Sequence, residues 1–395
     1  MNIDPQIGTS RSNSLQIPTT GVDETSEISP TLISAINDLT IDNNSDGDSD
    51  GERTLGDNDD TEELRNNNNN NNSNNNNSIN NGYSGPYNND GFGNSTTTIS
   101  QPVAPAELLP IIVDQPTATM IIPFRLRKSR EEMSQRELID FVISPVPQCQ
   151  KVLCKITRSK EGFGKLYPQY ELYIEEQLET GEETKTFLLS ARKRKNSKSS
   201  NYVITIDKLE TGILSKSTVG KVRSNFLGTA FAIYSNGRNP FKNEPNLDKS
   251  PIREELGAVV YDPNILGFKG PRKMTVLLTG MTKSGQRPEF RPAKESQTLI
   301  GKFRNGDHRD ILVLHNKSPQ WNEDTQSYVL NFNGRVTLAS VKNFQIVHDN
   351  DLDYIIMQFG RVEEDTFTMD FMYPMCPLQA FAIALTSFDA KLACE

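Results

Sequence analysis

The sequence ends with a short segment that is apolar on nearly every side. After Pro377, which can stand at the first position of a helix, the chain reads Leu-Gln-Ala-Phe-Ala-Ile-Ala-Leu and continues to Phe388. The apolar side chains do not gather on one stripe, and a helix that is apolar all round lies inside protein. With about 12 residues, the segment is also shorter than the roughly 20 residues that span a bilayer. The fold must therefore enclose this helix.

The sequence between residue 136 and this segment consists of short runs that are typical of strands. Alternation with a period of two residues appears in Tyr202–Ile206, Tyr328–Phe332 and Phe367–Phe371. Similar runs lie near 139–144, 151–157, 169–175, 185–190, 229–234, 256–261, 274–279, 310–315, 344–348 and 354–359. Gly, Pro, Asn or Asp separates them, and no long helical pattern intervenes. This arrangement indicates an antiparallel sandwich or barrel.

The width of a helix decides which barrel can hold it. A helix with its side chains is about 10–12 Å across, whereas an eight-stranded barrel has room only for its own side chains. About 11 or more strands are needed, as in the known can with a central helix. The sequence therefore predicts an all-β domain, a closed antiparallel barrel of about twelve strands filled by the C-terminal helix. A sandwich with the helix docked on it is the alternative.

The charges divide the chain into two parts. Residues 1–120 contain 18 acidic and three basic residues, a net charge of −15, and include asparagine runs at 66–72 and 74–77. Too few apolar side chains occur there to offset the entropy of ordering, so we expect a disordered tail. Residues 121–395 contain 39 basic and 33 acidic residues, a net charge of +6, and form the expected barrel domain. This asymmetry points to an anionic partner for the domain.

The sequence offers little for catalysis or metal binding. His308, His315 and His348 are isolated, and the four cysteines form no C-x-x-C pair, so the spacing of metal ligands is missing. No grouping of Ser, His and Asp suggests a nucleophile, and Gly162–Lys165 lacks the strand-to-helix context of a phosphate loop. Reduced cysteines and no signal peptide predict a cytoplasmic protein. We expect no enzymatic activity, no metal and no cofactor.

Several blocks of the sequence resemble the tubby-like family. They are Asn331–Thr337 with Ala339–Ile346, Gln379–Leu385 with Phe388–Glu395, Asn264–Met274, and Trp321–Val329. The similarity extends from about Leu138 to Glu395 and does not include the tail. It implies a twelve-stranded barrel around a C-terminal helix, which agrees with the periodicity. It also implies binding of phosphatidylinositol 4,5-bisphosphate, release from the membrane when that lipid is hydrolysed, and transport of receptors towards cilia, with some members acting in the nucleus.

The lipid site that this resemblance implies matches onto Gly220–Asn225, with Ser200–Tyr202 and Arg253 as further parts. Residues two apart on a strand share a face and lie about 6.6 Å apart, so Lys221 and Arg223 are expected to project together while Val222 points to the core. Two cations at that spacing suit two neighbouring phosphates of an inositol ring.

The surroundings of this strand add to the expected site. Residues 202–207 and 217–223 are predicted to form a hairpin with Gly212 in its turn, which would place Asn201 near Arg223, where its amide can hold a ring hydroxyl or a phosphate. Arg253 is followed by two glutamates, so an internal ion pair is its alternative role. A basic patch precedes the hairpin and comprises Arg192, Lys193, Arg194, Lys195 and Lys198. It can attract an anionic leaflet, serve as a nuclear localisation signal, or be a solvated loop.

The sequence thus predicts a phosphoinositide-binding adaptor at the inner leaflet of the plasma membrane, with the nucleus as a second location. The expected partners are a phosphoinositide headgroup and, through the tail, a protein cargo that links lipid signalling to trafficking. The alternative is a nucleic-acid-binding transcriptional regulator, because attraction to phosphate is not specific for lipids. The sequence shows no recognition helix or aromatic platform for bases, which favours the lipid.

Overall fold

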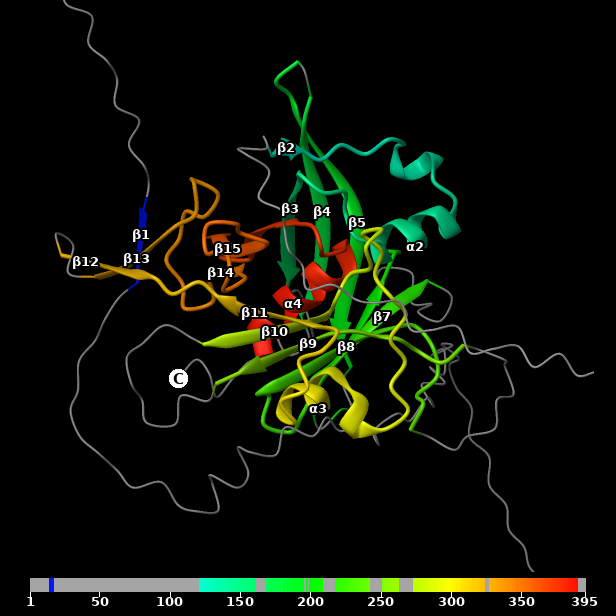
Figure 1. Ribbon diagram of the computed structural model, residues 1–395. Coiled ribbons are helices and arrows are strands. Elements are labelled where there is room, and N and C mark those ends of the chain that lie inside the picture. The colour runs from blue at the N-terminus through cyan, green and yellow to red at the C-terminus, as the bar shows by residue number, and fades with distance from the viewer. Residues whose placement is uncertain are drawn as a thin grey trace, which may run out of the picture. The chain divides into compact units, whose positions relative to one another are not determined.

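The computed structural model describes residues 14–17, 121–160, 168–178, 180–194, 197, 199–208, 217–241, 251–262, 273–323 and 327–389. Twelve strands form a closed ring, in the order β16-β15-β14-β11-β10-β9-β8-β7-β6-β5-β4-β3, and pairing of β16 with β3 closes it (Figure 1). All twelve neighbouring pairs are antiparallel. The predicted barrel is therefore confirmed, and the sandwich is not.

The ring uses strands of four to eleven residues. They are β3 (Gln150–Ser159), β4 (Gln169–Gln177), β5 (Glu183–Lys193), β6 (Asn201–Thr205), β7 (Thr218–Ser224), β8 (Ala230–Ser235), β9 (Glu255–Tyr261), β10 (Met274–Thr279), β11 (Ile311–Asn316), β14 (Phe344–Val347), β15 (Met357–Glu363) and β16 (Thr366–Met372). The short β2 (Ile122–Pro123) adds in parallel to β3. A separate three-stranded sheet contains β12 (Gln320–Asn322), β13 (Ser327–Asn331) and β1 (Ser14–Ile17).

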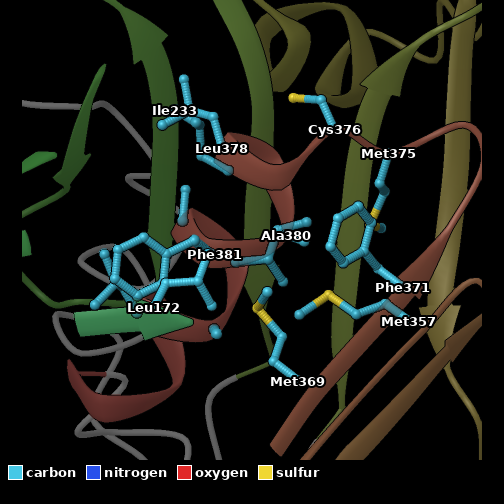
Figure 2. Packing of buried hydrophobic residues seen from close by; sticks show 14 of the residues in the cluster. Leu172, Ile233, Met357, Met369, Phe371, Met375, Cys376, Leu378, Ala380 and Phe381 are labelled. Atoms are coloured by element: carbon cyan, nitrogen blue, oxygen red, sulfur yellow. The ribbon is translucent and has the colours of Figure 1, made fainter. Parts of the chain in front are cut away.

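The helix α4 (Pro377–Asp389) occupies the barrel interior, as predicted. Its residues from Pro377 to Ser387 are all buried. Figure 2 shows Phe381 beside Leu172, and Leu378 beside Ile233. Sulfur-containing side chains from β15, β16 and the segment before the helix fill the space on another side, where Met357, Met369 and Met375 lie near Phe371. These flexible side chains suit the irregular gaps between a helix and a curved sheet.

One predicted strand is wrong. The run near 139–144 belongs to the helix α2 (Gln135–Ile143). A capping box starts this helix, since Ser134 Oγ accepts from the Glu137 N–H at 3.2 Å and the Glu137 carboxylate accepts from the Ser134 N–H at 2.9 Å. Leu138 and Val142 then share a buried face against α4. A short apolar run cannot distinguish a strand from a buried helical face, which explains the error.

Other short helices lie outside the ring. The helix α3 (Leu299–Arg304) follows η4 (Glu295–Gln297), and its Leu299 and Ile300 pack on Ala258 and Leu277, which face out from β9 and β10. A single 3-10 turn, η1 (Arg130–Glu132), precedes α2. None of the helices in the described residues has the length and apolar content to cross a bilayer. The predicted disordered tail, residues 1–120, lies outside the described residues apart from β1.

Candidate functional site

The strand β7 directs alternate side chains into the barrel and out of it. A Cβ built on Gly220 would lie 2.9 Å from Leu378 Cδ1 on α4, and Val222 is buried in the same core cluster as that helix. Both residues thus face the interior. Since neighbours on a strand alternate, Lys221 and Arg223 face outward together, as predicted.

The β6–β7 hairpin brings Asn201 next to the outer cations. In the antiparallel register Asn201 is paired with Arg223, which confirms the predicted placement. On the other side of β7, Arg223 is paired with Ala232 of β8. The amide oxygen of Asn201 is buried and accepts no hydrogen bond from the residues that the structure describes. The predicted turn residue Gly212 lies outside them.

An aromatic ring joins the remaining cation to this surface. Tyr234 is paired with Lys221 across the β7–β8 ladder, and the Arg253 guanidinium carbon lies 3.9 Å from the centre of the Tyr234 ring. This is a close cation–π contact. Burial and the nearby Glu255 raise the pKa of Tyr234, while the charges of Arg253 and Arg223 act in the opposite direction. The two arginines and this tyrosine therefore share one electrostatic environment.

The backbone at Arg253 is held by a close approach that only glycine permits. Arg253 N–H donates to Arg238 O at 3.0 Å, and Arg238 N–H donates to Pro251 O at 2.8 Å. Gly237, with φ of +141°, stands so close that a Cβ would lie 2.7 Å from Arg253 N. A side chain there would push the segment that carries Arg253 away.

The two glutamates after Arg253 have different surroundings. Glu254 pairs with Arg291 at 2.8 Å and is part of a surface ion pair. Glu255 is 1% exposed, and its Oε2 accepts from the Leu299 N–H at 3.1 Å. Burial raises the pKa of Glu255 to about 8, although the Leu299 N–H and the charge of Arg253 lower it. Burial therefore favours the neutral carboxylic acid form of Glu255.

The cations differ in their access to solvent. Lys221 is half-buried, whereas Arg223 and Arg253 are 1% and 2% exposed. The two arginines are therefore shielded from solvent in this structure, and Lys221 is the most accessible of the three cations.

Comparison with known proteins adds to this geometry. Residues 142–390 match the model of the Tub family. The chain belongs to the Tub family. Over 259 residues it is 52% identical to Tubby-related protein 3 of Mus musculus, covering 65% of this chain and 55% of that protein. It is 52% identical over 267 residues to Tubby protein homolog 1 of Caenorhabditis briggsae, covering 66% and 62%. It is also 49% identical over 270 residues to Tubby-related protein 1 of Mus musculus, covering 68% and 48%.

The chain thus spans about half the length of the curated relatives that it matches. The match does not include the acidic, asparagine-rich part of the sequence. Proteins of the Tub family are not known as enzymes.

One of the sequence blocks that resembles the Tub family has a structural role in this chain. The Arg335 guanidinium donates to Asp370 Oδ1 at 2.7 Å, to Glu175 Oε2 at 3.0 Å and to Cys154 O at 3.3 Å. It thereby fastens the segment after β13 to three adjacent strands of the barrel. Burial lowers the pKa of Arg335, but Asp370 and Glu175 outweigh burial and hold this pKa above its usual value.

The basic patch of this Tub family chain is only partly described. Arg192 and Lys193 end β5, Arg194 follows, and Lys195 and Lys198 lie outside the described residues. The Lys193 ammonium contacts the Asp389 carboxylate at 3.1 Å and Ser200 Oγ at 3.2 Å. Lys193 therefore joins the end of the central helix to the barrel rim, and it is not simply a solvated charge.

The described residues contain no cluster that suggests metal binding. Among them, no three side chains of His, Cys, Asp or Glu gather where they could hold a metal ion. His308 stacks on Phe303 at 5.5 Å, and His315 lies 3.7 Å from Asp349. Cys154 and Cys376 are buried free thiols.

The sequence interpretation missed Tyr234, and it considered Glu255 only as a possible ion-pair partner of Arg253 without predicting its burial. The alternation of β8 could have placed Tyr234 outward, because Phe231 and Ile233 are its interior residues. Its contact with Arg253 joins residues 19 positions apart in the chain, and no local pattern indicates such a contact. Glu255 stands before the run Leu-Gly-Ala-Val-Val-Tyr, and an acidic residue that enters an apolar strand is a usable signal of a buried carboxyl.

Proposed function

We propose that this Tub family chain is a phosphoinositide-binding adaptor that associates peripherally with the inner leaflet of the plasma membrane. The observation that carries the proposal is the outward projection of Lys221 and Arg223 from one strand, with Asn201 paired beside Arg223. Phosphatidylinositol 4,5-bisphosphate is the lipid that we expect it to recognise.

The spacing of the two cations supports this choice. Their Cα atoms are two residues apart on β7, about 6.6 Å. Two phosphates on neighbouring carbons of an inositol ring can each meet one cation at this separation. The planar fork of Arg223 suits one phosphate and the compact ammonium of Lys221 the other.

Two further side chains can contact the bound headgroup. The Asn201 amide oxygen can accept a hydrogen bond from a ring hydroxyl, since it accepts none from the described residues. Arg253 is already oriented by the ring of Tyr234, and Tyr234 is the residue paired with Lys221 in the β7–β8 ladder. Because Arg223 and Arg253 are buried, we expect the headgroup to contact Lys221 first and the arginines after a local rearrangement.

Flotation with phosphatidylcholine vesicles that contain the bisphosphate lipid tests the proposal. Lys221→Ala with Arg223→Ala removes two charge-assisted contacts and should weaken binding roughly 100-fold. Lys185→Ala with Lys317→Ala removes two surface cations, one on β5 and one directly after β11, and should leave binding unchanged. Equal binding by the first variant and the wild-type protein would contradict the site.

A binding experiment with duplex DNA distinguishes the proposed adaptor from the alternative, a transcriptional regulator. Sequence-selective binding to DNA that survives about 0.2 M salt, where nonspecific attraction to phosphate is weakened, would favour a transcriptional regulator. The adaptor proposal also includes a protein cargo bound by the tail. Capture of that cargo by residues 1–120 fused to an unrelated carrier is the corresponding experiment.

A further inference from the structure

The turn between β7 and β8 presents an exposed aromatic side chain. Phe226 is 78% exposed, well above Leu352 at 54%, which is next among the large apolar side chains of the described residues. It lies three positions beyond Arg223, on the same hairpin as both outer cations. The ring is thus within about 10 Å, along the strand, of the phosphate site proposed above.

The turn is rigid. Asn225 Oδ1 accepts from the N–H groups of Thr229 and Ala230 at 2.9 and 3.1 Å. Gly228, with φ of +69°, donates its N–H to Asn225 O at 3.2 Å. A Cβ on Gly228 would lie 3.3 Å from Asp389 O, so the turn also rests on the end of α4. The backbone that carries Phe226 is therefore held in place and needs little ordering when a partner arrives.

Basic residues of β5 lie at this end of the barrel, where Lys193 contacts Asp389 at the end of α4. The end of β5 carries Arg192 and Lys193, and Arg194 N–H donates to Asn201 O at 2.8 Å. Ser200 and Ser224 then join this segment to the end of β7, with Ser200 N–H donating to Ser224 Oγ at 2.8 Å and Ser224 N–H to Ser200 O at 2.9 Å. Basic side chains and an exposed aromatic ring thus share one rim.

We propose that Phe226 inserts into the headgroup–acyl boundary of the bilayer and acts as an apolar anchor beside the phosphoinositide. This inference rests on the proposed function, because the bound headgroup brings the rim to the membrane. A protruding apolar side chain flanked by Lys and Arg matches a membrane interface, which combines apolar depth with anionic charge. A stable protein interface needs about 1,000 Å² with a matching apolar patch, whereas the adjacent residue Leu227 is half-buried and Asn225 and Gly228 are buried.

The chain offers a matched control at the other end of the barrel. Leu352 lies in the β14–β15 connection, where Tyr354 Oη contacts Tyr373 O at 3.4 Å just before α4 begins. Phe226 lies where α4 ends. Both side chains are exposed, so their replacement by serine should leave the fold intact, and circular dichroism verifies this.

The experiment compares vesicles with the soluble headgroup. Phe226→Ser should bind bisphosphate-containing vesicles roughly tenfold more weakly than the wild-type chain, since part of the transfer energy of a phenylalanine is lost. Its affinity for soluble inositol 1,4,5-trisphosphate should not change. Leu352→Ser should match the wild type in both assays, and Lys221→Ala with Arg223→Ala should lose both.

Tryptophan fluorescence then measures how deeply position 226 inserts into the bilayer. The chain has one tryptophan, Trp321, so Phe226→Trp in a Trp321→Phe background reports on position 226 alone. Brominated acyl chains should quench this tryptophan and leave Leu352→Trp in the same background unquenched. If Phe226→Ser binds vesicles as tightly as the wild-type chain, the proposed anchor is wrong. It is also wrong if a tryptophan at position 226 is shielded by a second copy of the protein and not by lipid. Neither outcome affects the proposed headgroup site. Absence of wild-type binding to any phosphoinositide vesicle overturns the proposed function as well.

Discussion

Gly220 on β7 and Leu378 on α4 lie so close together that no side chain fits between strand and helix. A Cβ on Gly220 would be 2.9 Å from Leu378 Cδ1 and 3.0 Å from Tyr234 O. The strand that carries Lys221 and Arg223 therefore rests directly on the central helix. This contact fixes which side chains of β7 face outward.

Replacing Gly220 by valine should destabilise the fold by about 1–3 kcal/mol, because the added carbons must displace Leu378 or the β8 backbone. Urea unfolding measures this loss. Leu378→Ala should be less destabilising in the Gly220→Val background than alone, since the truncation makes room for the valine. Gly280→Ala, whose Cβ would meet Asp310 only at 3.5 Å, is the control and should have little effect. Purely additive effects of Gly220→Val and Leu378→Ala would argue against a direct contact.

Arg335 should be among the costly positions to truncate. Arg335→Ala leaves the Asp370 carboxylate, which has no exposed side-chain surface, without its main cation. Breaking a buried ion pair in this way costs about 3–5 kcal/mol of the free energy of unfolding. Adding Asp370→Asn should recover part of the loss, because the uncompensated charge is removed. Arg309→Ala breaks an exposed ion pair with Asp307 and should leave the thermal midpoint unchanged; equal losses at both arginines would contradict this role.

Tyr234 should act on lipid binding through Arg253. Tyr234→Phe keeps the ring under the guanidinium and should retain vesicle binding, whereas Tyr234→Leu removes the cation–π contact and should weaken binding about 3- to 30-fold. In an Arg253→Ala background the two tyrosine variants should bind vesicles equally, which a general loss of stability would not produce. Vesicle flotation of the two tyrosine variants, each with and without Arg253→Ala, tests this. A Tyr234→Phe variant as weak as Tyr234→Leu would indicate that the hydroxyl, not the ring, matters.

Glu255 should give the folded chain a pH-dependent stability. Its folded-state pKa of about 8 lies above the ordinary value of 4.5, so the folded chain binds more protons than the unfolded chain between these pH values. The contribution is fully present below about pH 4.5 and is lost as the pH rises through 8. Glu255→Gln should therefore become more stable relative to wild type by up to about 1.4 kcal/mol per pH unit over this window. Urea unfolding at pH 5, 7 and 9 tests this, and parallel stability curves would exclude the raised pKa.

Local patterns were sufficient for much of the architecture. An all-round apolar segment at Pro377–Phe388 required an enclosing fold, and its width required a ring larger than eight strands. Alternation within Tyr202–Ile206 and around Lys221 was enough for the hairpin register and for the pairing of Asn201 with Arg223. These features depend on residues close in the chain and on fixed helix and strand geometry. The same kind of reasoning failed at 139–144, where the Ser134–Glu137 capping box was the overlooked signal.

Contacts between distant residues decided the rest. The amino-acid sequence determined that β7 offers two cations on one face, because alternation is a property of the strand itself. Only the tertiary structure decided that Arg223 and Arg253 are buried, that Tyr234 lies under Arg253, and that Lys193 reaches Asp389. Burial and long-range pairing arise when the ring closes around its helix, and no local pattern records which surfaces that closure brings together.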